Sequence, residues 1–314
     1  MRDRKPGGRT AALRPDEEEV PLLLLRTLLF VPATNPDRIP KALASGADAV
    51  IVDLEDSVSV ERKAEARDSV VRFLEENPDR RGPPLYVRVN GPGTPWMDED
   101  VEGVVRPGLS GIFLPKSQRP EEVSALGDRV GALSKKRTCE APRIVPIVET
   151  ALGLLHAFEV ASADSGCAAL ALGGEDFARD IGAVRTPSGE EIALARMRVV
   201  LGARAAGVLP IDTVYTDFRD EAGLSRDAER ARRLGFAGKL VIHPRQVGTV
   251  NRAFSPSSLE IRRAREMVAA FEAARERGEA VAQLGGRMLD PAVVDQARRV
   301  VELAEEQSRV EALS

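Results

Sequence analysis

Short runs of apolar, often β-branched residues alternate with longer amphipathic segments from Leu28 onward. Runs of this length bounded by turn residues are typical of buried strands, whereas apolar residues spaced three and four apart are typical of helices. The pattern predicts eight strands: Leu28 to Pro32, Ala49 to Asp53, Leu85 to Asn90, Gly111 to Pro115, Ile144 to Glu149, Ala168 to Gly173, Thr213 to Thr216 and Leu240 to His243.

The segments between these strands have a helical period. The predicted helices are Pro36 to Ser45, Ser59 to Glu76, Pro120 to Lys135, Leu152 to Ser162, Ser188 to Ala206 and Ser225 to Leu234. An alternation of strands and helices is the signature of a parallel sheet built from βα units. Eight such strands favour an α/β fold of the (β/α)8 TIM-barrel type over an open doubly wound sheet, which more often has five or six strands.

The two ends of the chain depart from this pattern. Residues 1–20 are rich in Arg, Pro, Gly and Glu without an apolar period, which predicts a disordered leader. Residues 21–256 hold the predicted strands and form the expected barrel domain. Residues 257–314 hold two further amphipathic segments, Ser257 to Gly278 and Pro291 to Gln307, with a Gly-Gly break between them. We expect this C-terminal helical extension to cover the barrel or to reach a neighbouring subunit.

Composition and charge narrow the class of protein. Apolar residues make up 43% of the 314 residues and charged residues 30%, so a globular protein is expected. The net charge of -4 lacks the basic field typical of a nucleic-acid binder. Cys139 and Cys167 have neither a disulfide nor a metal-ligand spacing, which fits a reducing cytoplasm. The early apolar stretch Val20 to Leu25 is too short for a membrane helix and does not follow the pattern of a signal peptide.

Acidic residues close several of the predicted strands. Asp53 ends the second strand and Glu55 follows it, Glu149 ends the fifth and Asp176 follows the sixth. The carboxyl ends of barrel strands carry the chemistry in this fold, so we expect these acids to converge. Crowded carboxylates repel one another unless a cation neutralises them, and hard oxygen ligands favour Mg²⁺ or Mn²⁺. Taken singly, each acid could instead cap a helix or lie in a solvated loop.

Other polar residues at the strand ends have more than one interpretation. Arg88 could be a structural ion-pair partner, or it could clamp a carboxylate or a developing enolate oxygen, with Lys116 beside it. His243 fits a packed or capping histidine better than a catalytic base. The consecutive glycines before Glu175 could let Gly174 and its neighbour offer N–H groups to an anionic ligand. The chain has no Walker motif, and no GxGxxG follows the first strand.

The ordered set of motifs resembles the citrate lyase β-subunit-like family of the HpcH/HpaI superfamily, which includes malyl-CoA, β-methylmalyl-CoA and citramalyl-CoA lyases. The resemblance runs from about Arg26 to Arg299. It is carried by Arg26 to Pro32, Asp53 to Val58, Val87 to Asn90, Pro115-Lys116, Val148 to Thr150, Gly174 to Phe177, Gly238 to Pro244 and Gly285 to Asp290. The chain departs from the family pattern at two positions. The family usually has Gly where this chain has Ala33, and it often has an acid where this chain has Gly285.

The resemblance implies a role for each matching residue. Glu149 and Asp176 correspond to Mg²⁺ ligands, and Arg88 to the substrate clamp, with Asp53 and Glu55 supporting it. Asp290 corresponds to an acid/base that a C-terminal lid delivers, often from the adjacent subunit of a trimer or hexamer. The further residues expected to bind substrate are Arg26, Lys116, Gly174 and Glu175. Asp290 also precedes Pro291, a context typical of a helix N-cap.

The implied activity is Mg²⁺-dependent, reversible cleavage of a 3-hydroxyacyl-CoA thioester to an acyl-CoA and a 2-oxo acid such as glyoxylate or pyruvate. CoA would be part of the substrate. The alternatives are a citrate lyase β-subunit that acts on an acyl-carrier-protein thioester, a malyl-CoA thioesterase, and a metal-dependent (class II) 2-oxo acid aldolase without CoA. A non-enzymatic binding module would not need Glu149, Asp176 and Asp290 together.

Overall fold

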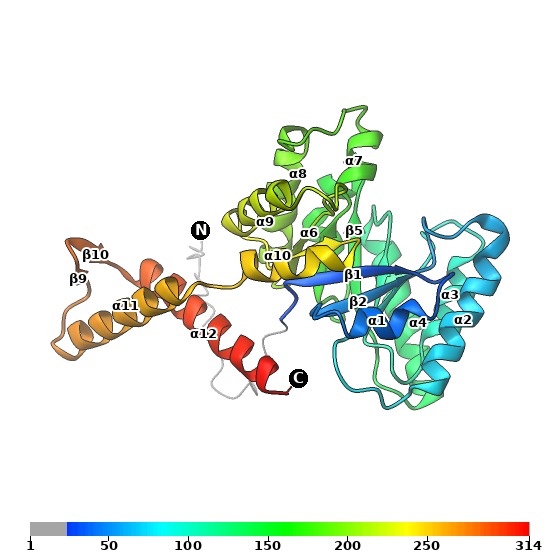
Figure 1. The fold of residues 1–314 in the computed structure, drawn as a ribbon, viewed down its shortest axis with the longest axis horizontal. Coiled ribbons are helices and arrows are strands. Elements are labelled where there is room, and N and C mark those ends of the chain that lie inside the picture. The colour runs from blue at the N-terminus through cyan, green and yellow to red at the C-terminus, as the bar shows by residue number, and fades with distance from the viewer. Residues whose placement is uncertain (1–23, 314) are drawn as a thin grey trace, which may run out of the picture.

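The computed structural model describes residues 24–313, and the expected leader of residues 1–20 lies outside them. The chain forms the predicted (β/α)8 barrel, in which eight parallel strands pair in chain order and β8 pairs with β1 to close the sheet (Figure 1). The barrel strands are β1 (Thr27–Pro32), β2 (Ala49–Asp53), β3 (Leu85–Arg88), β4 (Gly111–Leu114), β5 (Arg143–Val148), β6 (Ala169–Leu172), β7 (Leu209–Asp212) and β8 (Gly238–Val241).

Helices surround the strands and extend the chain beyond the barrel (Figure 1). They are α1 (Arg38–Leu43), α2 (Lys63–Glu76), α3 (Met97–Val104), α4 (Pro120–Arg137), α5 (Ala151–Leu155), α6 (Ala157–Ala161), α7 (Gly174–Asp180), α8 (Ala193–Ala205), α9 (Glu221–Leu234), α10 (Pro244–Phe254), α11 (Ser258–Glu276) and α12 (Pro291–Leu313), with 3-10 turns at Val60–Arg62 and Glu190–Ile192. No helix in residues 24–313 has the length and apolar character to cross a membrane.

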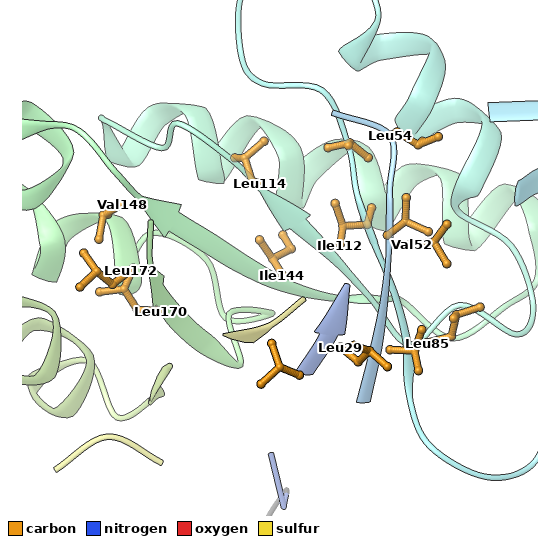
Figure 2. Close-up of a cluster of buried hydrophobic side chains, with 14 of the residues drawn as sticks. Leu29, Val52, Leu54, Leu85, Ile112, Leu114, Ile144, Val148, Leu170 and Leu172 are labelled. Carbon is orange, nitrogen blue, oxygen red and sulfur yellow. The ribbon is translucent and has the colours of Figure 1, made fainter. Parts of the chain in front are cut away.

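The barrel strands are buried on both faces, which explains their nearly continuous apolar runs. Alternate side chains such as Leu28, Ile51 and Phe113 fill the barrel interior. Their neighbours form the larger layer between the strands and the surrounding helices. Figure 2 shows part of that layer, with Leu29, Val52, Leu54, Leu85, Ile112, Leu114, Ile144, Val148, Leu170 and Leu172.

The structure corrects the position of the last two strands. The prediction of a seventh strand at 213–216 is wrong, because β7 is Leu209–Asp212 and the β-branched residues after it begin a loop. The eighth strand starts earlier than predicted, at Gly238, where a Cβ would meet the Leu25 carbonyl oxygen at 1.6 Å. Only glycine can follow the neighbouring backbone this closely.

Several helices also differ from the prediction. The segment expected as one helix at 152–162 is two short helices, α5 and α6, with His156 between them. The imidazole Nδ1 of His156 lies 2.8 Å from the Gln118 carbonyl oxygen, which holds the break in place. Three helices are not among the predicted segments: α3, α7 and α10. They lie in stretches dense in Gly, Pro and acidic residues or, like α10 after His243, directly follow a strand.

The extension stands beside the barrel in Figure 1 and has a small core of its own. Its helices α11 and α12 are joined by a hairpin of β9 (Ala282–Leu284) and β10 (Arg287–Leu289), which the sequence pattern did not indicate. The Gly-Gly break forms the hairpin turn, since both glycines have positive φ, 56° and 77°. Its core residues are Phe271, Ala274, Ala282, Leu289 and Val294.

Candidate active site

The acids at the strand ends gather around a cavity of about 430 Å³ at the carboxyl end of the barrel. Asp53, Glu149 and Asp176 line one part of the cavity together with Arg88. Apolar side chains, including Phe30, Leu172, Val214 and Ile242, line the rest. The expected convergence of acids from separate strands is therefore present, and it lies at the end of the barrel where this fold carries its chemistry.

Glu149 directly follows β5 and is only 3% exposed. Its Oε1 accepts a hydrogen bond of 2.7 Å from the backbone N–H of Lys116, whose left-handed φ of 52° turns that N–H toward the carboxylate. Its Oε2 lies against Gly173, where a Cβ would be 2.2 Å away. Burial and the charges of Glu55 and Asp176 raise the pKa of Glu149 to about 8. The site thus stabilises a cation near this carboxylate.

Asp176 lies in the first turn of α7, which follows β6, and pairs with Arg179 at 2.5 Å. Its charge is close enough to Glu149 to raise the pKa of that residue. Glu175, in the same turn, pairs with Arg185 at 2.8 Å and also lines the cavity.

The two glycines before Glu175 do not form the expected anion-binding nest. The N–H of Gly173 donates to the Val148 carbonyl at 3.1 Å, and the N–H of Gly174 donates to Thr213 Oγ1 at 2.8 Å. A Cβ on Gly174 would lie 2.9 Å from the same hydroxyl. These glycines are required for close packing between strand ends, and their N–H groups are committed within the protein.

Arg88 ends β3 and is held by acids from β2. Its Nε and Nη2 donate to the two oxygens of Asp53 at 2.6 and 2.7 Å, and its Nη1 lies 3.1 Å from Glu55. The guanidinium also lies over the Phe30 ring, 4.8 Å from its centroid. Burial alone would lower the pKa of Arg88, but the Asp53 and Glu55 charges raise it above its ordinary value. Arg88 is a permanent cation with a fixed orientation.

The carboxylates around Arg88 respond differently to burial. Burial would raise the pKa of Asp53, but the Arg88 charge and the N–H groups of Glu55 and Ser57 lower it overall. Burial raises the pKa of Glu55 in spite of Arg88 and of Lys116, whose Nζ contacts Glu55 Oε1. Asp53 therefore orients Arg88, whereas Glu55 links Arg88 to Lys116.

Four of the expected site residues do not line the cavity: Glu55 and Lys116 lie next to it, in contact with Arg88 and Glu55 respectively, and Arg26 and Asp290 lie away from it. Arg26 precedes β1 at the opposite end of the barrel, where it pairs with Asp48 at 2.8 Å and donates to Ser255 Oγ at 2.9 Å. Its buried ion pair gives it a structural role. Asp290 lies in the extension, where its Oδ1 accepts the Val293 N–H at 2.9 Å and caps α12. Within a single chain, this helix cap is the contact that the Asp290 side chain makes.

Some cavity residues were not expected from the sequence. Phe30 reads as one more apolar strand residue, although its ring supports Arg88. Thr213 reads as part of a strand, although its hydroxyl fixes the start of α7. The only signal was position, since Phe30 lies in the second half of β1 and Thr213 directly follows β7.

The donor set fits an open divalent-cation site. Within the described part of the chain, no group of three or more His, Cys, Asp or Glu side chains is placed to hold a metal ion. Mg²⁺ is usually held by one or two carboxylates, and waters and substrate oxygens complete its octahedron. Glu149 and Asp176 supply two such carboxylates, and a bound cation would oppose the burial and the like charges that raise the pKa of Glu149.

The fold and the site together define a barrel with an acidic, enzyme-like cavity at the carboxyl ends of its strands. The chain belongs to the HpcH/HpaI aldolase/citrate lyase family, whose model matches residues 26–244. The family is one of carbon–carbon lyases, so the expected family and enzyme class are confirmed.

Named relatives match most of the chain. The citrate lyase subunit beta of Leuconostoc mesenteroides subsp. cremoris is 37% identical, over 90% of this chain and 93% of its own. The human mitochondrial citramalyl-CoA lyase is 36% identical, over 89% of this chain and 85% of its own. CitE of Mycobacterium tuberculosis, solved with magnesium, acetoacetate and coenzyme A, has a TM-score of 0.74 at 30% identity and covers 89% of this chain and 98% of its own.

Proposed function

We propose that the chain is a Mg²⁺-dependent lyase, with Mn²⁺ as a substitute, that cleaves a 3-hydroxyacyl-CoA thioester to an acyl-CoA and a 2-oxo acid. Malyl-CoA, β-methylmalyl-CoA and citramalyl-CoA are the substrates of this type, and glyoxylate or pyruvate the oxo acid. The observation that carries the proposal is the buried, cation-deficient carboxylate of Glu149 next to a fixed arginine. The human citramalyl-CoA lyase and the magnesium-bound mycobacterial CitE support it.

In this proposal Glu149 and Asp176 hold the metal. Mg²⁺ supplies a Lewis acid for the carboxylate and carbonyl oxygens of the oxo acid when it is bound. Arg88 presents its guanidinium to the oxygen that becomes negative as the carbon–carbon bond breaks, and Asp53 and Glu55 keep it aligned.

Lys116 and Glu175 contribute to substrate binding at the rim. Lys116 lies across from Glu55, and Glu175 lines the cavity with its partner Arg185. Gly174 shapes the floor through its packing on Thr213. We leave Arg26 out of the substrate site because of its place at the other end of the barrel.

As the 3-hydroxyl loses its proton to water and becomes the carbonyl of the 2-oxo acid, the bonding electron pair passes to the α-carbon of the acyl-CoA as an enolate, which must then be protonated. We assign this proton to Asp290, which in the reverse direction removes it from the acyl group. Because Asp290 lies in the extension, which stands beside its own barrel, a second copy delivers it (Figure 1).

A homotrimer, or a hexamer made of two trimers, would allow this exchange. The barrel also presents an exposed apolar stripe on α8 and the adjacent α5 and α6, formed by Leu194, Leu201, Leu155 and Phe158. Apolar patches of this kind are typical of protein interfaces. Sedimentation of a stable 33.9 kDa monomer at micromolar concentration would contradict the assembly. We expect the assembly in the cytoplasm, with both cysteines free as in the structure.

The second candidate is a citrate lyase β-subunit that acts on an acyl-carrier-protein thioester, which the Leuconostoc relative favours. Both candidates use the same site, and they differ in what carries the thioester. Turnover of the purified chain with malyl-, β-methylmalyl- and citramalyl-CoA in Mg²⁺ separates them from each other and from a thioesterase. We expect acyl-CoA and an oxo acid as products. Free malate, or activity only with a carrier-protein thioester, would contradict the proposal.

A further inference from the structure

Two lysines in the described part of the chain are buried, and their ammonium groups contact different kinds of partner. Lys239 Nζ donates to two carboxylates, both at 2.6 Å. Lys63 in α2 is 6% exposed, and its Nζ donates to the backbone carbonyl oxygens of Leu54 and Glu55 at 2.8 and 2.7 Å. A buried ammonium is costly unless it is well paired. Lys239 thus balances charge, whereas Lys63 fixes the path of the backbone.

The backbone that Lys63 holds carries the support of Arg88. Both carbonyls directly follow Asp53, the last residue of β2. The Leu54 N–H donates to the Arg88 carbonyl oxygen at 2.9 Å, so Leu54 is held by Lys63 on one side and by β3 on the other. The next residue, Glu55, places its Oε2 3.1 Å from Arg88 Nη1. A shift of this backbone would therefore move a carboxylate that aligns the guanidinium.

The same face of α2 holds the segment after β3. Arg67 lies one turn after Lys63, and its Nη1 is 3.1 Å from Asp100 Oδ1. Asp100 is fully buried, and its Oδ2 accepts the backbone N–H and the side-chain amide of Asn90 at 3.0 and 2.6 Å. Asn90 comes two residues after Arg88. The helix therefore contacts both segments of the chain that position the guanidinium.

Trp96 connects the two segments directly. Lys63 Nζ lies 5.6 Å from the centroid of the Trp96 ring, in the loop between β3 and α3. The negative face of an indole attracts an ammonium group. Trp96 immediately precedes α3, the helix that carries Asp100. Lys63 thus links the loop after β2 to the loop after β3.

We propose that Lys63 is a positioning residue for Arg88 and acts by fixing the backbone that carries Glu55. Lys63 does not line the cavity, so it works through these contacts and not on the substrate. This inference rests on the proposed function and deepens it. It assigns the alignment of Arg88 toward the developing negative oxygen to a residue of α2.

The test replaces each buried lysine with methionine, which keeps most of the side-chain volume but has no donors. Per folded molecule, Lys63→Met should lower kcat roughly 10- to 100-fold, whereas Lys239→Met should leave kcat unchanged. Mg²⁺ affinity should stay at the wild-type value in both variants, because Glu149 and Asp176 follow other strands. Lys63→Arg keeps the cation and its N–H donors and should recover most of kcat. If Lys63→Met does not fold, Lys63→Gln, which has amide donors without the charge, replaces it with the same expected direction.

A double substitution tests the route through Glu55. Residues that act in one network have non-additive effects. Lys63→Met should therefore cause little further loss of kcat in a Glu55→Gln background. A full further loss, a wild-type kcat in Lys63→Met, or an equal loss in Lys239→Met would contradict the inference.

A binding measurement separates this inference from the proposed function. Oxalate is a dianion that chelates Mg²⁺ and leaves two charged oxygens for a guanidinium. Titrated with Mg²⁺ into the full chain by calorimetry, oxalate should bind Lys63→Met and Glu55→Gln roughly 10-fold more weakly than the wild type, and Lys239→Met as tightly. If the wild type cleaves no thioester but this pattern holds, the function fails and the positioning role stands. If oxalate binds Lys63→Met as tightly as the wild type, the inference is wrong.

Discussion

Two clusters of buried charged side chains on the same barrel differ in the balance between positive and negative groups. Between the strands and the helices α8 and α9, Arg196 and Lys239 each contact both Asp212 and Asp227 at 2.6 to 2.9 Å. Two cations face two anions there. The cavity cluster has Arg88 and Lys116 against several carboxylates, and Glu149 has its pKa raised to about 8.

The difference shows how a structural network can be told from a reactive one. In the balanced cluster, burial raises the pKa of Asp227 but the Lys239 and Arg196 charges lower it overall, so the protein itself satisfies the carboxylate. In the cavity cluster, Glu149 accepts a backbone N–H and lies beside open space, but no cationic side chain among the described residues forms an ion pair with it. An excess of like charge is relieved by a bound proton or by a bound cation. This is why we assign the metal to the cavity.

Removal of a metal ligand should have the largest effect on activity. Glu149→Gln keeps the oxygen that accepts the Lys116 N–H but cannot become an anion. We expect Mg²⁺-dependent turnover to be lost, while the apo-protein melts at the wild-type temperature or above, since repulsion with Glu55 and Asp176 is relieved. Steady-state kinetics over a Mg²⁺ series and a thermal melt measure both effects. Near wild-type turnover at ordinary Mg²⁺ would remove Glu149 from the metal site.

Substitution of the proposed proton donor comes next. Asp290→Asn keeps a capping oxygen for Val293 but cannot transfer a proton. Loss of a general acid or base lowers the rate roughly 10²- to 10⁴-fold, whereas loss of a cap costs about 1 kcal/mol of stability. We therefore expect a large fall in kcat with an unchanged melting temperature.

Delivery of Asp290 from a neighbour has its own control. Mixed oligomers of Asp290→Asn and Glu149→Gln subunits should recover part of the activity, because some sites combine an intact metal centre with an intact extension. Recovery would fail if each subunit used its own Asp290. That result would also argue against the position of the extension beside its own barrel as the catalytically active arrangement.

Much of this site was predictable, and the reasons are local. Asp53, Arg88, Glu149 and Asp176 each end or follow a strand, and a parallel barrel brings all such positions to one end. Arg26 showed the limit of a motif, since it directly precedes β1 and therefore lies at the other end of the barrel. The atoms that the Arg26 side chain contacts depend on tertiary packing.

Other features depended on packing that no local pattern encodes. The loop from Thr213 is β-branched and apolar like a strand, but only the register of β7 with β8, which pairs Asp212 with Lys239, sets where the strand ends. The roles of the glycines before Glu175 likewise came from the atoms around them, the Glu149 carboxylate and the Thr213 hydroxyl.

Disruption of the balanced cluster should lower stability and leave catalysis intact. Lys239 is fully buried, so Lys239→Met leaves Asp212 and Asp227 with one cation between them. Removal of one partner from a buried ion pair costs roughly 3–5 kcal/mol. We expect a reduced free energy of unfolding in urea but a wild-type kcat per folded molecule. The surface variant Arg252→Gln should change neither.

The last prediction is a pH dependence that separates the two clusters. The folded pKa of Glu149, about 8, lies above its ordinary value of 4.5, so between these values the folded apo-protein binds more protons than the unfolded chain. Its stability should then fall as the pH rises from about 5 to 8, and Mg²⁺ affinity should rise over the same range because the metal competes with that proton. Glu149→Gln should flatten both trends, whereas Lys239→Met should leave the slope unchanged. Urea unfolding of the metal-free protein at pH 5, 6, 7 and 8 measures it, and a wild-type slope that survives Glu149→Gln would assign the titration to another group.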